Sequence, residues 1–541
     1  MAPLLLGLLP GLLLGSCGMV PTTVQGNPPD VSGQAVRVTF LHTGDIHSRL
    51  YPYSFDPSFT DEGLGLNPDA GPFGGMARIA HILNEQRGRS RRVLHVDTGD
   101  CFQGAVVFNT YAGEVEFRTL TEAGLNAAVL ANHEFDKGAE NVVEQASRWA
   151  HFPLLAANYD FLDADLPWAT ELETIIKPTA MYDLDGVRIG IIGLGNISSL
   201  NSLDEESNSL GITVKGYGEV IPQYADLLRQ QGADLVVVIS HLGVETDQDI
   251  ARNLDGVDLI FGGHNHIALS PPIVVTNAKS GKRIPIVHSG AFAKFVGRLD
   301  AVVKDQELLS WEYHLYPVDA TVPDDPAVGQ ILDEYALELN QEYNLDQILG
   351  YAETDLTRYG VTGGDSMLGN FCAEAMRSFP GVETEIALTN TLGIRADIPA
   401  GDITLDDLYN SMPFDNTITT MFLSGREVQE LLDYVAYRSS ERGCQSQAQV
   451  AGIRFTMDCA AQVALDIQIN GAPLDPNGMY ELATNNYIAH GGSGFEVLQR
   501  NTTQIDTDVS IRDVVRAGIT RYQDLPQPGV CEEDGRILPV Y

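Results

Sequence analysis

The segment AAVLANHEFD, residues 127–136, joins a short apolar run to a group of polar side chains. The run Ala127 to Leu130 predicts a buried strand, and the polar residues begin directly after it. Asn132 can offer a metal its amide oxygen. His133 can donate a proton or hydrogen bond to a phosphoryl oxygen, and Asp136 can fix the tautomer and orientation of its imidazole. The segment therefore predicts a strand that ends in a metal-dependent site.

Four more clusters of metal-ligating side chains follow short apolar runs in the same way. The runs are rich in β-branched residues and cover positions 36–41, 93–96, 235–239 and 259–261. The clusters that follow them contain Asp45, His47, Asp100, His241, His264 and His266. Helical patterns at 76–86, 115–123 and 217–230 lie between the runs. This alternation predicts an α/β sandwich in which the strand ends bring the ligands to one edge.

The five blocks, taken in order, resemble those of a known family. Asp-x-His, Gly-Asp, Asn-His-Glu-Phe-Asp, Ser-His-Leu-Gly and Gly-His-x-His are similar to the blocks of the bacterial 5'-nucleotidase family, within the calcineurin-like metallophosphoesterase superfamily. The resemblance continues into the second half of the chain. It implies an N-terminal four-layer α/β/β/α metallophosphoesterase sandwich, a linker helix and a C-terminal α+β substrate-binding domain. Ala131 stands where the family usually has glycine.

The resemblance also implies two divalent metal ions with Asp100 as the bridging ligand. The first ion would be bound by Asp45, His47, Asp100 and His266, and the second by Asp100, Asn132, His241 and His264. A hydroxide shared by the two ions would attack phosphorus, and His133, oriented by Asp136, would stabilise charge on the phosphoryl group or the leaving oxygen. Nitrogen and oxygen ligands without a thiolate suit manganese, zinc or iron.

Other residues with ligand chemistry are expected to be structural. Seven histidines match no block: His42, His81, His95, His151, His288, His314 and His490. Cys101, beside Asp100, is expected to be a small buried residue and no ligand.

Composition restricts the partners of the chain. With 541 residues, of which 44% are apolar, the chain is too long for one core and predicts two large domains. A net charge of −40 argues against binding to polymeric nucleic acid, which relies on a basic surface. The expected partner is a small nucleotide or phosphate ester, whose charge must be met locally by metal ions and arginines. The sequence does not indicate the oligomeric state.

The first residues resemble an export signal. Leu4 to Leu14 is an apolar run too short to span a bilayer, and it ends in Leu-Gly-Ser-Cys at 14–17. We predict a lipoprotein signal over 1–17 with Cys17 as the lipidated residue, followed by a tether over 18–34. The protein would be exported, as a periplasmic or cell-surface lipoprotein or in secreted form. Membrane contact would come only through the lipid, and a disordered apolar tail is the alternative.

The resemblance implies that the rest of the chain divides into a metallophosphoesterase domain (35–323), a linker helix (324–349) and a 5'-nucleotidase C-terminal substrate domain (350–541). Ile331, Tyr335 and Leu339 have helical spacing in the linker. The resemblance implies that the C-terminal domain rotates about this helix. The alternative is an ordinary amphipathic helix that packs on one domain.

The C-terminal domain is expected to bind the substrate. Residues 366–370 resemble the family's Ser-x-Leu-Gly-Asn entry to a helix, which is expected to continue through Ala375. The segment from Thr389 to Arg395 resembles the family's Asn-Gly-Gly-Gly-Ile-Arg loop. The resemblance assigns Asn390 and Arg395 to substrate binding, because a guanidinium can hold two phosphoryl oxygens at once. Thr391 and Leu392 replace two of the glycines. Arg358 is a second candidate phosphate contact.

Recognition of the nucleoside is assigned by the same resemblance. Phe414 and Asn416 lie in a Pro-Phe block, and Tyr487 stands where a second aromatic residue is expected, so the two rings could hold a base between them. Ser493 stands where the family has an aspartate that accepts hydrogen bonds from ribose. One neutral hydroxyl accepts more weakly than a carboxylate, so nucleoside selectivity is expected to differ.

Six cysteines are compatible with an oxidising compartment. Cys444 and Cys459 flank a short segment near an apparent hairpin and are the preferred disulfide. A bond from either one to Cys531 is the alternative.

Three hypotheses follow for the function. The first is an exported two-metal phosphohydrolase that acts on nucleoside 5'-monophosphates and on related nucleotides. The second keeps the metals and changes the substrate to 2',3'-cyclic nucleotides, 3'-nucleotides, nucleotide sugars or another small phosphate or sulfur ester. The third is a non-catalytic surface-binding lipoprotein.

Overall fold

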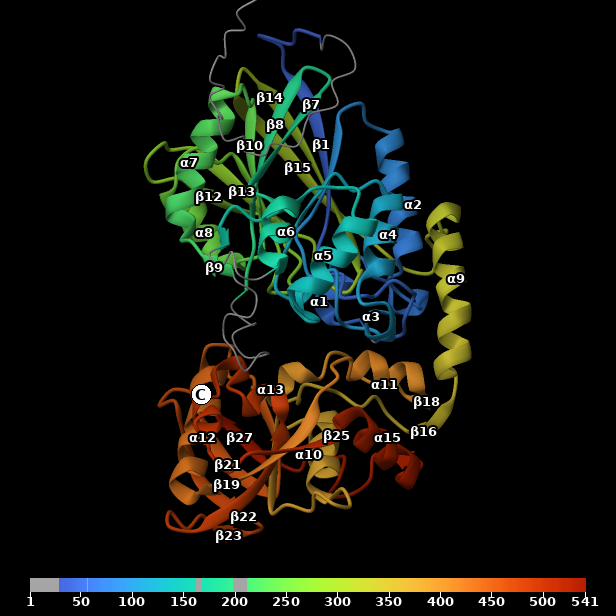
Figure 1. Cartoon of the computed structure of the whole chain (residues 1–541), viewed down its shortest axis with the longest axis vertical. Helices are drawn as coiled ribbons and strands as arrows, with labels where there is room; N and C mark the ends of the chain where they lie inside the picture. Colours follow the sequence, from blue (N-terminus) through green and yellow to red (C-terminus); the bar gives the residue numbers. More distant parts are fainter. Residues whose placement is uncertain (1–28, 56, 162–166, 198–211) are drawn as a thin grey trace, which may run out of the picture.

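The computed structural model describes residues 29–55, 57–161, 167–197 and 212–541. Figure 1 shows two lobes, one from the N-terminal part of the chain in blue to green and one from the C-terminal part in orange to red. The yellow helix α9 (Pro326–Tyr343) runs along one side of the molecule and leads from one lobe to the other. The predicted signal at 1–17, its Cys17 and most of the predicted tether lie outside the described residues.

The N-terminal lobe is built on a seven-stranded and a six-stranded sheet. Their strand orders are β15-β14-β1-β2-β3-β4-β6 and β12-β13-β11-β10-β8-β7. The first sheet contains β1 (Val36–Thr43), β2 (Val93–Asp97), β3 (Ala127–Val129), β4 (Leu154–Leu155), β6 (Ile176–Lys177), β14 (Phe295–Lys304) and β15 (Glu307–Pro317). The second contains β7 (Thr179–Leu184), β8 (Val187–Leu194), β10 (Leu235–Ser240), β11 (Leu259–Gly262), β12 (Ile273–Thr276) and β13 (Arg283–His288). A short ribbon pairs β5 (Tyr159–Phe161) with β9 (Ile212–Val214).

Alternation along the strands explains why the two sheets stack. On β10, Leu235 and Val237 join a core shared with Phe40 of the first sheet, whereas Val236 and Val238 join a core on the opposite face. Every second side chain of a strand points to the same face, so a strand with sheet on one side and helix on the other must be apolar throughout. The uninterrupted apolar runs of the sequence therefore correspond to strands that are buried on both faces.

Helices cover the outer faces and complete four layers, α/β/β/α, as predicted. The helices of this lobe are α1 (Phe59–Gly63), α2 (Met76–Gly88), α3 (Val106–Tyr111), α4 (Glu114–Glu122), α5 (Gly138–Trp149), α6 (Pro167–Ile175), α7 (Tyr217–Gln230) and α8 (Val244–Asn253). Ile79 of α2, Phe117 of α4 and Val142 of α5 share one core with Leu41 of the first sheet. Ile221 of α7 and Ile250 of α8 pack on the second sheet. The predicted strands and the three predicted helices are thus confirmed in place.

Parallel pairing brings the predicted ligand loops together. Strands β1, β2 and β3 pair in parallel in one sheet, and β10 and β11 pair in parallel in the other. Parallel strands open at a common carboxyl edge. The loops that follow these five strands consequently meet at the end of the sandwich that faces the C-terminal lobe (Figure 1).

Helix α9 packs on the N-terminal lobe. Its start is defined by Asp325, whose side chain accepts hydrogen bonds from the backbone N–H groups of residues 327 and 328, and by Pro326 in the first turn. Val328, Leu332 and Leu339 are buried in the same core as α2 and α4. The helix lies inside the predicted linker. Its packing on the N-terminal lobe agrees with the alternative interpretation, an ordinary amphipathic helix that packs on one domain. The proposed rotation about it stays a prediction.

The C-terminal lobe mixes helices with three small sheets, the α+β arrangement that was expected. The sheets have the orders β18-β16-β26, β20-β17-β24-β19-β25 and β23-β22-β21-β27. Their strands are β16 (Ile348–Ala352), β17 (Ile386–Asn390), β18 (Gly401–Thr404), β19 (Thr417–Ser424), β20 (Ala448–Ala451), β21 (Ile453–Asp458), β22 (Val463–Ile469), β23 (Ala472–Pro473), β24 (Met479–Asn485), β25 (Ile505–Ser510), β26 (Asp524–Leu525) and β27 (Ile537–Val540). The helices are α10 (Met367–Ser378), α11 (Leu405–Ser411), α12 (Gly425–Ser440), α13 (Asn486–Ala489), α14 (Glu496–Gln499) and α15 (Ile511–Tyr522).

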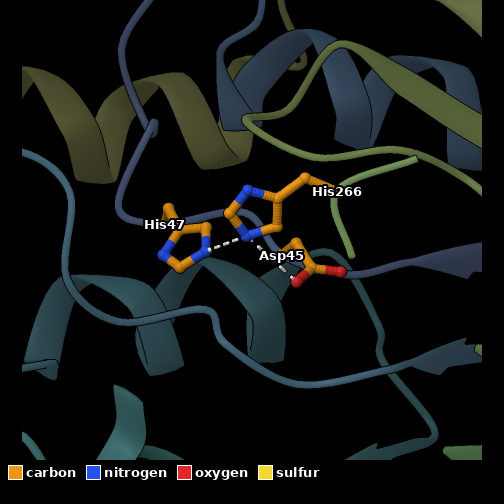
Figure 2. Close-up of side chains that lie close together, drawn as sticks. All are labelled: Asp45, His47 and His266. Atoms are coloured by element: carbon orange, nitrogen blue, oxygen red, sulfur yellow. Dashed lines mark hydrogen bonds and ion pairs between the residues drawn. The ribbon is translucent and has the colours of Figure 1, made fainter. Parts of the chain in front are cut away.

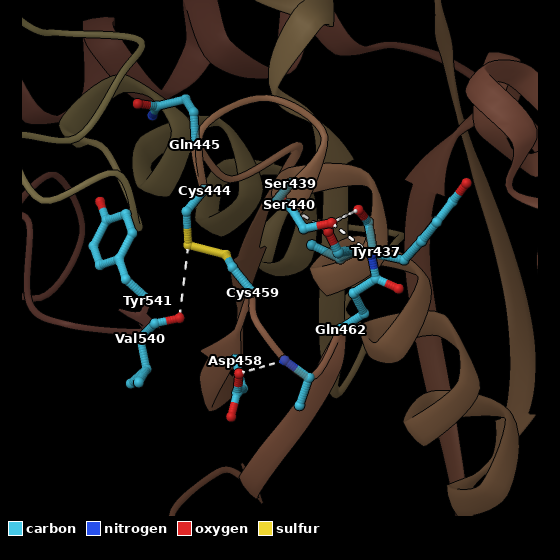
Figure 3. The surroundings of a disulfide bond; sticks show 12 residues. Tyr437, Ser439, Ser440, Cys444, Gln445, Asp458, Cys459, Gln462, Val540 and Tyr541 are labelled. Atoms are coloured by element: carbon cyan, nitrogen blue, oxygen red, sulfur yellow. Dashed lines mark hydrogen bonds between the residues drawn. A yellow bond between two sulfur atoms is a disulfide. The ribbon is translucent and has the colours of Figure 1, made fainter.

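A disulfide joins Cys444 to Cys459, which confirms the preferred pairing (Figure 3). It ties the segment after α12 to the end of β21. Cys531 is buried and carries a free thiol, so the alternative pairing is wrong. Cys101 is also a buried free thiol and belongs to none of the metal-binding groups among the described residues. In the part of the chain that the structure describes, no helix combines the length and apolar character needed to cross a bilayer.

Candidate metal and phosphate site

The predicted ligands project from the loops that follow the five parallel strands, in unusual backbone conformations. Asp45, His47, Asp100, His264 and His266 all have positive φ, between 49° and 78°. Non-glycine residues seldom adopt this left-handed region, because Cβ crowds the following carbonyl. Such conformations persist only where the surrounding structure holds them, and they cluster at functional sites.

The first group of ligand atoms comes from Asp45, His47 and His266 (Figure 2). His47 Nε2 lies 2.9 Å from His266 Nε2, which lies 3.5 Å from an Asp45 carboxylate oxygen. The other ring nitrogen of His47, Nδ1, is 2.8 Å from the Gln103 carbonyl and donates to it, so Nε2 is left for a ligand. Burial lowers the pKa of both imidazoles well below its usual value, which keeps the rings neutral, as metal ligands must be.

The second group comes from Asp100, His241 and His264. His241 donates through Nδ1 to the Thr98 carbonyl at 2.7 Å, and its Nε2 lies 2.8 Å from Asp100 Oδ2. Burial disfavours the charged ring, but the Asp100 carboxylate outweighs it and raises the pKa of His241 to about 10. A position between two ligand atoms that attracts a proton so strongly also attracts a metal cation.

Asn132 supports the same conclusion independently. Its Oδ1 is buried and has no hydrogen-bond partner within the described parts of the chain. A buried amide oxygen without a donor is unfavourable, and it is also the oxygen that the sequence assigns to a metal. Asp100 belongs to the second group and to a further group with His47 and His133, so it lies between the predicted metal positions. The Asp and His clusters with Asn132 therefore fit a binuclear divalent metal site.

His133 and Asp136 form the predicted dyad. A short 3-10 turn, His133–Phe135, places the Asp136 carboxylate 2.7 Å from His133 Nδ1. Burial opposes a charge on His133, but the carboxylates of Asp136 and Asp100 outweigh burial and raise its pKa. With Nδ1 donating to Asp136, Nε2 is the nitrogen left to act on a ligand in the cleft.

Glu134 organises the site and was not identified from the sequence. It is buried, and its two carboxylate oxygens accept hydrogen bonds from the backbone N–H groups of Asp100, Cys101, Phe102 and Ala131. One side chain thus holds the loop after β2 against the loop after β3. The available signal was an acidic residue directly after the predicted catalytic residue His133, just past a buried strand.

The C-terminal lobe closes over the metal ligands and leaves a cleft of about 1490 Å³ between the lobes. Arg395 Nη2 lies 3.1 Å from His47 Nε2, so the predicted phosphate-binding arginine reaches the first ligand group. Its guanidinium carbon lies 5.8 Å and 5.7 Å from the ring centroids of Phe292 and Phe414. Burial, and then the nearby Arg358, lowers the pKa of Arg395 to about 10. Its buried Nε has no acceptor among the described residues, as expected of a donor that awaits an anion.

The loop that carries Arg395 is stabilised by its neighbours. Thr391, which replaces a glycine, donates its hydroxyl to the Ser446 carbonyl at 2.9 Å and is fully buried. Arg358 donates from Nη1 to the Arg395 carbonyl at 2.6 Å. Asn390 Oδ1 accepts a hydrogen bond from Asn485 at 2.8 Å. Part of the donor capacity of Arg358 therefore supports the Arg395 loop.

The predicted nucleoside-binding residues line the same cleft. They are Phe414, Asn416, Tyr487 and Ser493. The Phe414 ring lies 6.2 Å from that of His133, next to the dyad. Ser493 Oγ lies 3.3 Å from the Tyr487 hydroxyl, and the Ser493 carbonyl accepts a hydrogen bond from Tyr434 at 2.8 Å. The structure brings these side chains to the cleft wall and leaves their roles as predictions.

Histidines outside the blocks have ordinary structural partners where they are buried. His42 Nε2 is 2.7 Å from the Tyr313 hydroxyl, His95 Nε2 is 3.1 Å from the Thr43 hydroxyl, and His288 Nε2 is 2.9 Å from Asp247. None of these three histidines belongs to the ligand groups found among the described residues.

Two arginines of the cleft wall were also missed. Arg438 lies on the last turn of α12, and Arg442 follows the helix one turn later. Their spacing of four residues, which places side chains on one face of a helix, was the available signal.

Two family models match the chain. The calcineurin-like phosphoesterase model matches residues 38–268, and the model of the 5'-nucleotidase C-terminal domain matches residues 344–500. The chain is 27% identical over 538 residues to a 5'-nucleotidase from Diplobatis ommata, with 93% of this chain and 90% of that protein covered. The solved structure of a 5'-nucleotidase precursor from Thermus thermophilus has 28% identity and a TM-score of 0.83, and the match covers 93% of this chain and 99% of the other.

A sulfate thiohydrolase from Thermus thermophilus has a TM-score of 0.77 at 20% identity, over 96% of this chain and 98% of its own, which shows a shared fold. The family matches, together with the ligand clusters, make the chain a metal-dependent phosphoester hydrolase and argue against a non-catalytic binding protein. With a calcineurin-like phosphoesterase domain followed by a 5'-nucleotidase C-terminal domain, the chain belongs to the 5'-nucleotidase family.

Proposed function

We propose that this protein is an exported phosphohydrolase that releases phosphate from nucleoside 5'-monophosphates and related nucleotides. The observation that carries the proposal is the position of Arg395, whose Nη2 lies 3.1 Å from His47 Nε2. A guanidinium from one lobe thereby lies beside the cluster of predicted metal ligands of the other. A phosphoryl group in this position would contact both.

The metal ions would be held as the sequence blocks suggest. Asp45, His47, Asp100 and His266 would hold one ion, and Asp100, Asn132, His241 and His264 would hold the other. When bound, two such ions supply a lowered pKa for water and neutralise charge on a phosphoryl group. The Asp100 carboxylate is suited to bridging, because it groups with His241 and His264 of one ligand set and with His47 of the other. Its Oδ2 is 2.8 Å from His241 Nε2, and its Oδ1 accepts the backbone N–H of His133 at 2.9 Å.

His133 would act on the substrate itself. Because Asp136 accepts the proton of Nδ1, Nε2 can donate a hydrogen bond to a phosphoryl oxygen or a proton to the leaving oxygen. Its raised pKa favours the proton-carrying form. His133 from the N-terminal lobe and Arg395 from the C-terminal lobe would then stabilise the negative charge that develops on the substrate.

The nucleoside would lie in the C-terminal half of the cleft. Phe414 and Tyr487 offer two aromatic faces, and Asn390, Asn416 and Ser493 offer polar contacts. A second candidate substrate class is favoured by Ser493, whose neutral hydroxyl is already 3.3 Å from that of Tyr487. This arrangement gives ribose a weak acceptor, so 2',3'-cyclic nucleotides, 3'-nucleotides, nucleotide sugars or another small phosphate or sulfur ester are the alternatives.

Export is proposed from the first residues and from the disulfide. The apolar run from Leu4 to Leu14 and the Leu-Gly-Ser-Cys motif at 14–17 indicate a lipoprotein signal. The Cys444–Cys459 bond supports an oxidising compartment, where disulfides persist. Lipid on Cys17 would hold the protein at a membrane surface, and cleavage without lipid would release it.

The test is a substrate panel with the purified full-length protein. Metal-free protein is loaded with manganese, zinc, iron or cobalt and assayed for phosphate release from 5', 3' and 2',3'-cyclic nucleotides, a nucleotide sugar and an aryl phosphate. We expect metal-dependent release, fastest with a nucleoside 5'-monophosphate. A preference for the cyclic or 3' compounds would support the second class. No release with any metal would contradict the proposal.

A further inference from the structure

The cleft presents Arg395 as one well-placed guanidinium, although a phosphoryl group has three peripheral oxygens. Arg358 is the neighbour expected to help, but its Nη1 donates to the Arg395 carbonyl at 2.6 Å and its guanidinium lies 4.8 Å from the Tyr359 ring centroid. Arg358 therefore stabilises the loop that carries Arg395. In a chain with a net charge of −40, a second local cation would be important for binding a phosphate dianion.

The end of helix α12 and the turn that follows it bring further arginines to the cleft wall. Tyr434, Arg438 and Arg442 are four residues apart, and all three line the cleft. Arg438 pairs with Glu441 at 3.5 Å. Within the described parts of the chain, Arg442 has no hydrogen-bond acceptor or carboxylate within ion-pair distance for its guanidinium, and its side chain is exposed to the cleft. Its donors are thus available to a bound anion.

The backbone around Arg442 is held in place. The N–H groups of Arg442 and Cys444 both donate to the Ser439 carbonyl, at 3.0 Å and 2.8 Å. Gly443 and Cys444 have φ values of 66° and 64°, which turn the chain sharply after the helix. Cys444 is then fixed to β21 by the disulfide with Cys459 (Figure 3). A side chain that leaves a fixed segment loses less entropy when it binds a ligand.

Arg442 and Arg395 line the same cleft as the metal centre. Arg395 touches His47 of the first ligand group. The walls that Arg442 shares include Asp100, Asn132 and His264, which are the expected ligands of the second ion. A phosphoryl group bound at the centre would therefore lie in the same cavity as both guanidinium groups.

We propose that Arg442 is a second phosphoryl-binding residue, which holds the phosphate group of the substrate together with Arg395. The proposal deepens the proposed function and rests on it for the identity of the anion. The ligand chemistry is a phosphate ester or the inorganic phosphate that its hydrolysis releases. Bidentate contact with two phosphoryl oxygens is what a guanidinium provides and an ammonium does not.

The experiment measures binding of inorganic phosphate to the metal-loaded full-length protein by titration calorimetry. Arg442→Gln is compared with the wild type and with Arg426→Gln, which removes the same charge from an exposed position on the first turn of α12, outside the cleft. We expect Arg442→Gln to weaken phosphate binding by about tenfold, and Arg426→Gln to bind phosphate within about twofold of the wild type. The phosphate affinity of Arg442→Lys should lie between those of Arg442→Gln and the wild type.

Two outcomes would overturn the proposal: phosphate affinity of Arg442→Gln within about twofold of Arg426→Gln, or no phosphate binding by the wild type at millimolar concentration. Thermal melting of the variants checks that each one folds. Parallel assays with an aryl phosphate separate the two proposals. If the wild type binds phosphate through Arg442 but hydrolyses no ester, the proposed function fails and the binding role stands. If esters are hydrolysed and Arg442→Gln binds phosphate normally, only the binding role fails.

Discussion

Replacing Glu134 with glutamine should weaken metal binding indirectly, although Glu134 is not a predicted metal ligand. The buried carboxylate accepts four backbone hydrogen bonds, at 2.7 to 3.3 Å, from residues 100, 101, 102 and 131. Glutamine has nearly the same shape, but one of its two terminal groups is an NH2 that cannot accept a hydrogen bond. Two of the four backbone donors would therefore lose their acceptor and face another donor.

The size of the effect follows from these contacts. A buried donor without an acceptor costs about 1–3 kcal/mol, so two such donors cost about 2–6 kcal/mol before the loops relax. After relaxation we expect the free energy of unfolding of the N-terminal lobe to fall by about 3 kcal/mol. The released loops carry Asp100 and Asn132. Loss of groups that hold metal ligands typically weakens metal affinity by about 10- to 100-fold, and we expect a loss in that range.

Glu116→Gln is a matched control. Glu116 is also buried, but it accepts one hydrogen bond, from the Ser48 hydroxyl at 2.6 Å, and its Oε2 has no partner among the described residues. Burial raises the pKa of both carboxyls to about 7, so urea unfolding of the metal-free protein and manganese titration are best done at pH 8. Equal losses of stability and metal affinity in the two variants would refute the reasoning.

Four other perturbations have defined outcomes. His133→Ala should lower kcat by about 10²- to 10⁴-fold with little change in metal content. Steady-state kinetics and metal analysis of the variant would measure both quantities. Loss of metal with unchanged turnover per remaining metal site would contradict the catalytic role of His133. Asp100→Asn should impair both metal positions, whereas a variant with two tightly held metals would disprove bridging. Replacing both Cys444 and Cys459 with serine should lower the free energy of unfolding of the C-terminal lobe by about 3 kcal/mol, the value for a loop of about 15 residues; an unchanged urea midpoint would disagree. Ser493→Asp should raise kcat/KM for a nucleoside monophosphate relative to an aryl phosphate, and an unchanged ratio would argue against ribose binding there.

The metal centre was largely predictable because it depends on local patterns. An apolar run followed by a ligand indicates both a strand and the position of that ligand, since parallel strands open at the same edge. Asp45 and His241 could be placed in this way without knowing which sheet each strand joins. Strand β10 is an example: its run is apolar throughout because both of its faces are buried, and this pattern is visible in the sequence whichever sheet the strand joins.

Residues that act through long-range contacts were not predictable in the same way. In the sequence nothing distinguishes Glu134 from the other acidic residues, because the two loops that its carboxylate joins come together only in the folded structure. Arg442 lies about 180 residues from His264 in the sequence, and only the docking of the lobes brings both residues into one cleft. The disulfide was identified because its two cysteines flank one local hairpin.

The site is therefore complete only when the two lobes are docked. The predicted metal ligands come from the N-terminal lobe, and Arg395, which reaches them, comes from the C-terminal lobe. Their juxtaposition is maintained by contacts across the interface, such as Arg49 Nη2 to the Asn410 carbonyl at 2.7 Å and Asn109 Nδ2 to the Pro413 carbonyl at 3.0 Å. A change in the angle between the lobes would withdraw Arg395 from His47 without disturbing any metal ligand. Metal affinity should consequently depend on residues of one lobe, and phosphate affinity on residues of both.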